Sequence, residues 1–319
     1  MKKYDDKILI NTTSCQEPGQ AEHDPTQKRM NHKKGFIGIL KIISSFGLKN
    51  SFTNVFYRPS REAYREPEDL ESHAVPKIFK SRDGIKLSGW LLGSRSKGNA
   101  KATVVHFHGC CHNMKFDAHQ VDWLTGSGFN VFIFDYRGYG ESQGFPDRHG
   151  IQQDGLAALD YVRGLPEIDA TRILVLGQSL GGCICLAALS DADRRGIRGI
   201  AVDGTFGSYR ALVNSKMTGT FLSYPLASLI VSDELAAINV ISALSPIPLC
   251  FFHGSRDRVI PIGLGQKLFE SAEQPKVFHV VEQAQHMQTF TIFGQENRPR
   301  LAEFFNSCID GIETKTDKA

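Results

Sequence analysis

Short apolar segments of strand length alternate with helical segments along most of this chain, and this alternation limits the fold more than any other feature. Strand-like runs rich in β-branched residues occur at 102–107, 130–135, 172–176, 199–203, 248–253 and 277–281. Helical patterns fall at about 113–126, 151–163 and 179–189, and after 262 and 298. Such βαβα repetition predicts a mostly parallel sheet covered by helices on both faces. Residues 77–80 and 85–92 are expected to form a leading antiparallel pair.

The alternation stops at both ends of the chain and once in its middle. Residues 1–34 are polar and are expected to be disordered, and 313–319 form a polar tail. The main domain is expected to span 58–312, and a charged, proline-bearing boundary is placed near 57–76. Within it, 205–246 is aromatic and apolar without a strand–helix rhythm, which predicts a small helical cap. Three of its aromatic residues are candidates for contacting the substrate, namely Phe206, Tyr209 and Phe221.

An apolar run at Phe36–Leu48 lies within an expected amphipathic helix over 35–57. Its 13 residues would span roughly 20 Å as a helix, against roughly 30 Å for a bilayer core, and Lys41 interrupts the run. A secretory signal would lie closer to Met1. Three interpretations stay open: a helix packed on the domain, a helix lying in a membrane surface, or a membrane span. The protein is expected to be cytoplasmic, and peripheral membrane association through 35–57 is one alternative.

Charge and cysteine content exclude some classes of protein. The formal net charge is +3, and Lys and Arg are spread along the chain, so no nucleic-acid partner is expected. The seven cysteines are an odd number without a C-x-x-C zinc pattern. They are interpreted as reduced thiols in a reducing compartment, which favours a cytoplasmic location.

A candidate nucleophile stands where a predicted strand meets a predicted helix. The segment Gly177-Gln178-Ser179-Leu180-Gly181 has the form G-x-S-x-G. In this context the turn is sharp, exposes the serine hydroxyl and needs small neighbours, while the helix N-terminus offers free N–H groups to an oxyanion. The alternative is a glycine-flanked helix cap, because serine is a good N-cap residue.

The loop after the 102–107 strand is a candidate for the second half of an oxyanion hole. It reads HFHGCCHN over 106–113. Acyl transfer needs two N–H donors aimed at one point, and these are expected from the backbone of Cys110 and Leu180. His108 is expected to hold the loop through side-chain hydrogen bonds.

The residues of this loop allow two other interpretations. His106, His108 and His112 could be metal ligands, but no further ligand is evident nearby, so no metal is expected. Cys110 or Cys111 could be a nucleophile, but neither stands at a strand-to-helix turn.

A candidate acid and base follow the last two predicted strands. Asp257 lies in the polar loop after 248–253, and His286 lies in the loop after 277–281. Parallel strands present their carboxyl ends together, so both can reach Ser179, with His286 as base and Asp257 orienting it. The alternatives are an Asp257 that caps a turn or pairs with an arginine, and a His286 that is a surface residue. Asp203, at another strand end, is a rival acid.

Taken together, these motifs resemble the α/β-hydrolase superfamily, in its serine aminopeptidase-like and depalmitoylating-thioesterase-like branch. The matching stretches are HFHG at 106–109, FDYRGYGES at 134–142, GQSLGG at 177–182, HGSRDRVIP at 253–261 and QH at 285–286. The resemblance covers roughly residues 78–306 and implies an α/β-hydrolase fold, with a mostly parallel eight-stranded sheet, helices on both faces and a small helical cap. Two stretches depart from the usual pattern of this family: the loop reads HGCCHN where relatives often have HGN, and Gln285 stands before His286 where relatives often have Gly.

These observations lead to a serine hydrolase that cleaves a carboxylic ester or thioester through an acyl-enzyme on Ser179. A serine peptidase or amidase of the same fold is one alternative, and a non-catalytic binding protein of that fold is another. The expected partner is a small-molecule or acyl substrate, without a cofactor. A nicotinamide cofactor is rejected because Gly138, Gly140 and Gly144 miss the G-x-G-x-x-G spacing by one residue.

Overall fold

The computed structural model describes residues 56–62, 64, 66–216 and 231–311, which belong to a unit running from Phe52 to Ala319. Several predictions lie outside these residues: the polar N-terminus, nearly all of the 35–57 helix, Phe221 and the polar tail. Among the helices within the described ranges, none is both long and apolar enough to cross a membrane.

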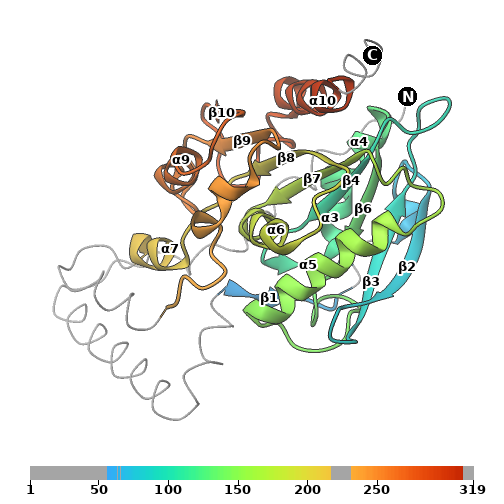
Figure 1. Cartoon of the computed structure of the whole chain (residues 1–319), viewed down its shortest axis with the longest axis horizontal. Helices are drawn as coiled ribbons and strands as arrows, with labels where there is room; N and C mark the ends of the chain where they lie inside the picture. Colours follow the sequence, from blue (N-terminus) through green and yellow to red (C-terminus); the bar gives the residue numbers. More distant parts are fainter. Residues whose placement is uncertain (1–55, 63, 65, 217–230, 312–319) are drawn as a thin grey trace, which may run out of the picture. The chain divides into compact units, whose positions relative to one another are not determined.

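An eight-stranded sheet forms the centre of the described fold, with the strand order β10-β9-β8-β7-β4-β6-β3-β2 (Figure 1). Its strands are β2 (Ala74–Lys80), β3 (Lys86–Leu92), β4 (Thr103–Phe107), β6 (Asn130–Phe134), β7 (Ile173–Gln178), β8 (Ile197–Asp203), β9 (Leu249–Gly254) and β10 (Lys276–Val281). From β10 to β6 neighbouring strands are parallel, whereas β3 is antiparallel to both β2 and β6. The predicted mostly parallel sheet with a leading antiparallel pair is confirmed.

The central strands are buried on both faces, as their β-branched apolar sequences predict. Every residue of β4 is buried. Its neighbours Val104 and Val105 pack into two different core clusters, because successive side chains of a strand point to opposite faces. The sheet therefore has one hydrophobic core on each side.

Helices cover both faces of the sheet (Figure 1). Side chains of α5 (Arg148–Arg163), α6 (Leu180–Asp191) and α9 (Ile262–Glu270) join the core that contains Val105. Side chains of α3 (Met114–Val121), α4 (Trp123–Gly126) and α10 (Gly294–Asp310) join the core that contains Val104. The ten residues of α6 from Leu180 to Leu189 are all buried, so this helix lies within the core rather than on the surface.

One predicted helix is two helices in the structure. The sequence pattern indicated a single helix over about 113–126, but the chain forms α3 and α4 with a break at Asp122. The carboxylate of Asp122 accepts the N–H of Glu71 at 3.0 Å, and its carbonyl accepts the hydroxyl of Thr125 at 2.6 Å. Glu71 is distant in sequence from Asp122, and Thr125 follows it in the next helix. Hydrophobic periodicity carries no information about such hydrogen bonds.

The chain between β8 and β9 contains the stretch predicted to be a helical cap. Its described parts include α7 (Tyr209–Lys216) and two short 3-10 helices, η4 (Ala237–Asn239) and η5 (Ile241–Leu244). Both η4 and η5 contact α6, so the C-terminal end of the stretch packs back onto the core. No strand is formed by the described residues between Gly204 and Pro248.

A second, two-stranded sheet was not predicted from the sequence. β1 (Arg58–Pro59) pairs in parallel with β5 (Cys111–His112). The predicted domain boundary also contains a 3-10 helix, η3 (Pro67–Asp69). The β1–β5 pair ties the start of the domain to the loop that follows β4, next to the candidate nucleophile.

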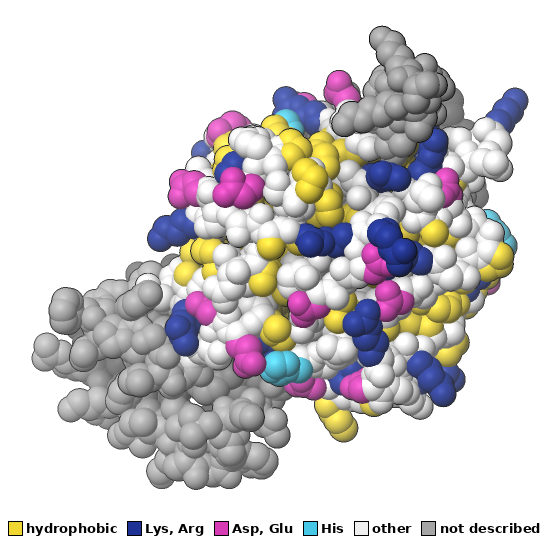
Figure 2. All heavy atoms as spheres, viewed as in Figure 1, with side chains coloured by type: hydrophobic (Ala, Val, Ile, Leu, Met, Phe, Trp, Pro, Cys, Tyr) yellow, Lys and Arg dark blue, Asp and Glu magenta, His cyan; other side chains and the backbone are white. Residues whose placement is uncertain are grey.

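Charged side chains of both signs are interspersed on the face shown in Figure 2, and Lys and Arg do not gather into a stripe there. Exposed ion pairs among the described residues include Arg82 with Asp160 at 2.7 Å and Arg300 with Glu296 at 2.6 Å. Exposed pairs of this kind contribute little to stability, typically about 0–1 kcal/mol each. The face drawn in Figure 2 thus carries charges of both signs rather than a patch of one sign.

Candidate active site

Ser179 occupies a strained turn between β7 and α6. β7 ends at Gln178 and α6 begins at Leu180, so one residue makes the change of direction. Ser179 has φ 54° and ψ −124°, a positive-φ conformation that non-glycine residues rarely adopt. Such strain is concentrated at functional sites, where the surrounding structure holds it.

Two glycines make this turn sterically feasible. A Cβ on Gly181 would collide with the carbonyl oxygens of Phe107 and His108. A Cβ on Gly177 would lie 2.6 Å from the Cα of Gly182, closer than side-chain carbons approach. The close approach of α6 to β7 and to the loop after β4 therefore requires both glycines, as the G-x-S-x-G pattern indicated.

The structure brings the three predicted triad residues together at one edge of the sheet. Nε2 of His286 lies 2.9 Å from Oγ of Ser179, and Nδ1 of His286 lies 2.7 Å from Oδ2 of Asp257. They follow β7, β9 and β10, which are parallel strands with their carboxyl ends on the same side. The carboxylate of Asp257 can only accept, so Nδ1 of His286 carries a proton and Nε2 is free to accept the serine hydroxyl.

Backbone N–H groups fix the other oxygen of the acid. Oδ1 of Asp257 accepts the N–H groups of Val259 and Ile260, each at 2.8 Å. His253 lies beside the same carboxylate at 3.7 Å, with its Nε2 bonded to the carbonyl of Ile260 at 2.8 Å. Asp257 therefore bonds its own loop through Oδ1 and His286 through Oδ2.

The rival acid, Asp203, points elsewhere. Its Oδ1 accepts the hydroxyl of Thr289 at 2.7 Å, and its Oδ2 accepts the side-chain N–H of Gln178 at 3.2 Å. The hydrogen bond to Nδ1 of His286 comes from Asp257 instead.

The loop after β4 passes directly beside the serine. A Cβ on Gly109 would lie 3.6 Å from Cβ of Ser179 and 4.0 Å from its Oγ. Leu180 is the first residue of α6, and the first N–H groups of a helix have no acceptor within it. The structure thus places both of the predicted oxyanion-hole segments, around Cys110 and Leu180, next to Ser179.

Three consecutive carbonyls of this loop are held by hydrogen-bond donors. The Tyr136 hydroxyl donates to the carbonyl of His108 at 3.1 Å, and Nδ1 of His108 lies 2.8 Å from the carbonyl of Gly109. The carbonyl of Cys110 accepts the Tyr139 hydroxyl at 2.8 Å and the Arg58 N–H at 2.9 Å. In a trans peptide the C=O and N–H point in opposite directions. Holding the Gly109 carbonyl therefore orients the N–H of Cys110.

Sequence reasoning missed Tyr136, Tyr139 and Arg58 as supports of this loop. Both tyrosines lie in the DYRGY stretch after β6, and each is completely buried. A buried tyrosine usually finds a partner for its hydroxyl, which is the one signal that could have indicated such a role. The expected support from His108 is present, since its ring nitrogen bonds the loop.

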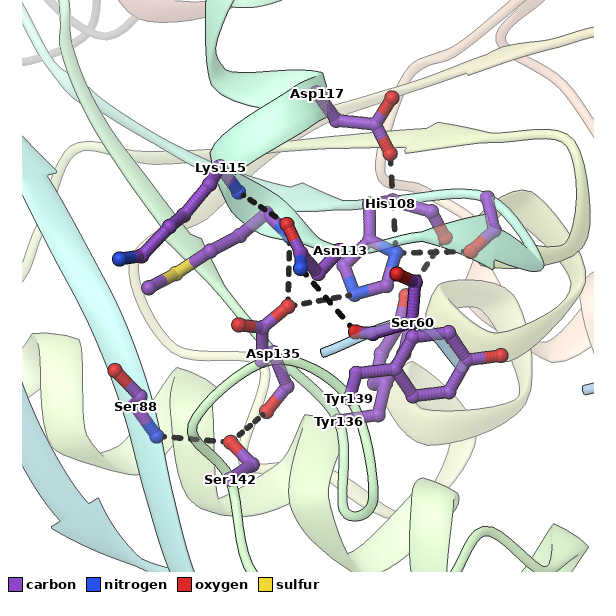
Figure 3. Close-up of polar contacts among 12 residues, drawn as sticks. Ser60, Ser88, His108, Asn113, Lys115, Asp117, Asp135, Tyr136, Tyr139 and Ser142 are labelled. Carbon is purple, nitrogen blue, oxygen red and sulfur yellow. Dashed lines mark hydrogen bonds and ion pairs between the residues drawn. The ribbon is translucent and has the colours of Figure 1, made fainter. Parts of the chain in front are cut away.

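A buried cluster of ionisable groups lies beneath the loop (Figure 3). His108 stands between two carboxyl groups, with Nδ1 3.8 Å from Asp117 and Nε2 3.7 Å from Asp135. Burial lowers the pKa of His108 to about 3, raises that of Asp117 to about 7 and raises that of Asp135 to about 8. His108 is therefore neutral, with its proton on Nδ1 because the Gly109 carbonyl can only accept.

These raised pKa values give a pH dependence of stability. The folded protein holds protons on Asp117 and Asp135 that an exposed carboxyl releases above a pH of about 4. The stabilisation from these bound protons is fully present below that pH, and it is lost as the pH rises through the folded-state pKa values of Asp117 and Asp135. We expect the wild-type Tm to fall between pH values of about 5 and 9. Asp135→Asn, which stays neutral at every pH, should show a flatter decline in differential scanning fluorimetry.

The buried ion pair of Asp154 gives a contrasting variant for this experiment. Oδ1 of Asp154 accepts from Nη2 of Arg137 at 2.8 Å, and the Asp154 side chain is completely buried. Removing one charge of a buried pair is strongly destabilising, by about 3–5 kcal/mol. Asp154→Asn should therefore lower Tm at every pH. If Asp135→Asn keeps the wild-type pH slope, Asp135 does not hold the buried proton.

The alternative roles of the loop find no geometric support. His106 bonds Gln178 at 2.9 Å, and His108 bonds the Gly109 carbonyl. Within the described ranges, no group of three His, Cys, Asp or Glu side chains is arranged to hold a metal ion. Sγ of Cys110 lies 3.2 Å from Sγ of Cys111, and neither cysteine stands at the strand-to-helix turn.

Two of the predicted substrate-contact residues lie in the core. Phe206 and Tyr209 are each 1% exposed and pack edge to face, with ring centroids 5.3 Å apart. Tyr209 also packs against Phe56 at 5.0 Å and lies under the guanidinium of Arg148 at 3.9 Å. Phe221 is outside the described residues.

Known proteins resemble this chain in sequence and in structure. Residues 98–237 match the family described as serine aminopeptidase S33. The chain is 34% identical over 260 residues to YfhR of Escherichia coli, covering 81% of this chain and 88% of that protein. It is 26% identical to bem46 of Schizosaccharomyces pombe, over 75% and 79% of the two chains. The structure of the Pyrococcus furiosus esterase Pf2001 superposes with a TM-score of 0.65 and 23% identity, covering 79% and 97%.

Proposed function

This chain belongs to the α/β-hydrolase superfamily, in one family with YfhR, and we propose that it is a serine hydrolase that cleaves carboxylic esters or thioesters. The observation that carries the proposal is the continuous hydrogen-bonded series from Ser179 through His286 to Asp257, at 2.9 and 2.7 Å. Each group follows a separate strand, and the hydrogen bond from Nδ1 of His286 to Asp257 leaves Nε2 facing the serine hydroxyl.

In the first step, Oγ of Ser179 attacks the carbonyl carbon of the substrate while Nε2 of His286 takes its proton. Asp257 stabilises the imidazolium that forms. The negative charge that develops on the carbonyl oxygen is accepted by the N–H groups of Cys110 and Leu180. The hydrogen bonds to the loop after β4 keep the Cys110 N–H in place before the reaction, so no reorganisation is needed.

In the second step, the imidazolium of His286 gives its proton to the leaving alcohol or thiol, and an acyl group remains on Ser179. A water molecule then takes the place of the leaving group, and His286 removes its proton as it attacks the ester. The acid product leaves and the serine regains its proton.

A peptidase or amidase is the second candidate, favoured by the match of 98–237 to the serine aminopeptidase family. An aminopeptidase needs an anionic group for the substrate ammonium. The two carboxylates beside the base already have partners: Asp257 bonds His286, and Asp203 bonds Thr289 and Gln178. This favours an ester or thioester over a free N-terminus.

A panel of substrates separates these candidates. The full-length protein is expected to cleave p-nitrophenyl esters and acyl thioesters with a higher kcat/KM than aminoacyl anilides. Anilides cleaved better than esters would establish the peptidase instead. A protein that neither turns over any of these compounds nor reacts with a fluorophosphonate would be a non-catalytic member of the superfamily.

A further inference from the structure

The turn at the end of β8 touches all three members of the triad. The N–H of Ser179 donates to the carbonyl of Asp203 at 2.9 Å, and the hydroxyl of Thr205 donates to the carbonyl of Ser179 at 2.8 Å. Gly204 lies between them with φ +57°, and a Cβ there would stand 3.4 Å from Nδ1 of His286 and 3.5 Å from Oδ2 of Asp257. The 203–205 turn is therefore packed against the catalytic groups, although no step of the mechanism uses it.

The side chain of Asp203 links two loops that are distant in sequence. Its Oδ1 accepts the hydroxyl of Thr289, three residues after His286, at 2.7 Å. Its Oδ2 accepts from the amide of Gln178, the residue before Ser179, at 3.2 Å. The oxygen of that amide lies 2.9 Å from Nε2 of His106, which completes the chain of bonds. One carboxylate thus joins the loop after β10 that carries His286 and Thr289 (the base loop) to the turn around Ser179 (the nucleophile turn).

This carboxylate also brings charge to the site. Asp203 is 1% exposed, and burial raises its pKa to about 6, so it is an anion at neutral pH and above. The charged groups that act on it are His286, which favours its anionic form, and Asp257, which opposes it. His106 faces it through Gln178, and His253 faces Asp257 at 3.7 Å. Burial lowers the pKa of both histidines, so neither of these neighbours supplies a neutralising charge at neutral pH.

We propose that Asp203 is a positioning residue of the hydrolytic site, which holds the base loop against the nucleophile turn and favours the imidazolium that forms on His286. The proposal rests on the proposed hydrolase function. It assigns two separable contributions to one side chain: a mechanical one through Thr289 and an electrostatic one through the negative charge. Each contribution can be removed by a different substitution.

Asp203→Asn removes the charge and keeps a hydrogen-bond partner for Thr289 and Gln178, the two residues that the carboxylate bonds. The new Nδ2 would donate to the oxygen of Gln178, whose amide would then donate to Nε2 of His106. That histidine would carry its proton on Nδ1, which has no partner within the described structure. Without the anion, the imidazolium is less favoured and the base is neutral at lower pH. The acid limb of the kcat/KM–pH profile should therefore move down by about 0.5–1 pH unit, and kcat should fall about 3–10-fold.

Thr289→Val removes the tether, and it also raises the pKa of Asp203 because the Thr289 hydroxyl helps to lower it. The rates are therefore compared at alkaline pH, where the carboxylate stays charged; there the variant is expected to lower kcat and the rate of fluorophosphonate labelling, with little change in KM. Thr289→Ser restores the hydroxyl and should recover both rates. A matched control is Thr125→Val, because the Thr125 hydroxyl is equally buried and bonds the carbonyl of Asp122 at 2.6 Å, away from the triad.

The outcomes distinguish this proposal from the function on which it rests. If the wild type is not labelled by a fluorophosphonate, the hydrolase function fails, whatever the variants do. If the wild type is labelled, an Asp203→Asn protein that folds and keeps the wild-type acid limb overturns the electrostatic role. Thr289→Val rates equal to those of Thr125→Val overturn the tether, and this result stands even where Asp203→Asn fails to fold.

Discussion

Ser179→Ala is expected to abolish labelling by a fluorophosphonate and to reduce kcat for the best ester substrate by about 10⁵–10⁶-fold. The variant removes the atom that would bond to the acyl group, and no other hydroxyl among the groups described here is paired with His286. The remaining rate would come from the oxyanion hole and substrate binding alone.

The fold should tolerate this change. Ser179 is one side chain in a turn whose geometry depends on Gly177 and Gly181, and alanine differs from it by a single oxygen. We expect a change in the free energy of unfolding within about 1 kcal/mol, measured by urea denaturation. Ser190→Ala is the matched control, because Ser190 lies on the same helix and its hydroxyl bonds the carbonyl of Ala187 at 2.8 Å. That variant should label like the wild type.

Mass-spectrometric mapping of the labelled peptide gives the decisive reading. The adduct should lie on Ser179 in the wild type and in Ser190→Ala. Labelling that persists in Ser179→Ala would place the nucleophile elsewhere, with Cys110 and Cys111 as the first residues to examine because they lie in the adjacent loop.

Local sequence patterns were sufficient to predict the sheet and the positions of the catalytic candidates. β4 and β7 are short apolar runs whose periodicity and flanking glycines mark them as buried strands. Once strands are placed and parallel, their carboxyl ends share an edge, so Ser179, Asp257 and His286 could be assigned to one site from their order along the chain. The sequence favoured Asp257 as the acid but left Asp203 as a rival, since both follow strands of the sheet.

The remaining features depend on contacts between distant side chains, which periodicity does not contain. Arg58 reaches Cys110, Tyr139 reaches the same carbonyl, and Thr289 reaches Asp203. Phe206 and Tyr209 show a second limit: aromatic residues in an irregular stretch were expected to contact substrate, and the structure buries both against the core. Composition alone does not tell a pocket wall from a core residue.

Asp257→Asn should reduce kcat for ester hydrolysis by about 10³–10⁴-fold at neutral pH, although asparagine has nearly the same shape. The structure fixes which way the new amide points. The N–H groups of Val259 and Ile260 both donate to Oδ1 at 2.8 Å, so the amide oxygen must occupy that position. The amide nitrogen then replaces Oδ2 and presents a donor to Nδ1 of His286.

Two donors cannot face each other, so His286 would move its proton to Nε2, the nitrogen that must accept the proton of Ser179. The variant would thus fold and bind substrate while its base is in the wrong tautomer. Steady-state kinetics should show the loss in kcat with KM little changed, and ¹⁵N NMR of the labelled histidine should show a protonated Nε2. Asp169→Asn is the control, because that carboxylate also accepts a backbone N–H within its own turn, from Thr171 at 2.9 Å, but contacts no catalytic group. A kcat for Asp257→Asn within about tenfold of the wild type would mean that the orientation of the imidazole does not depend on this carboxylate.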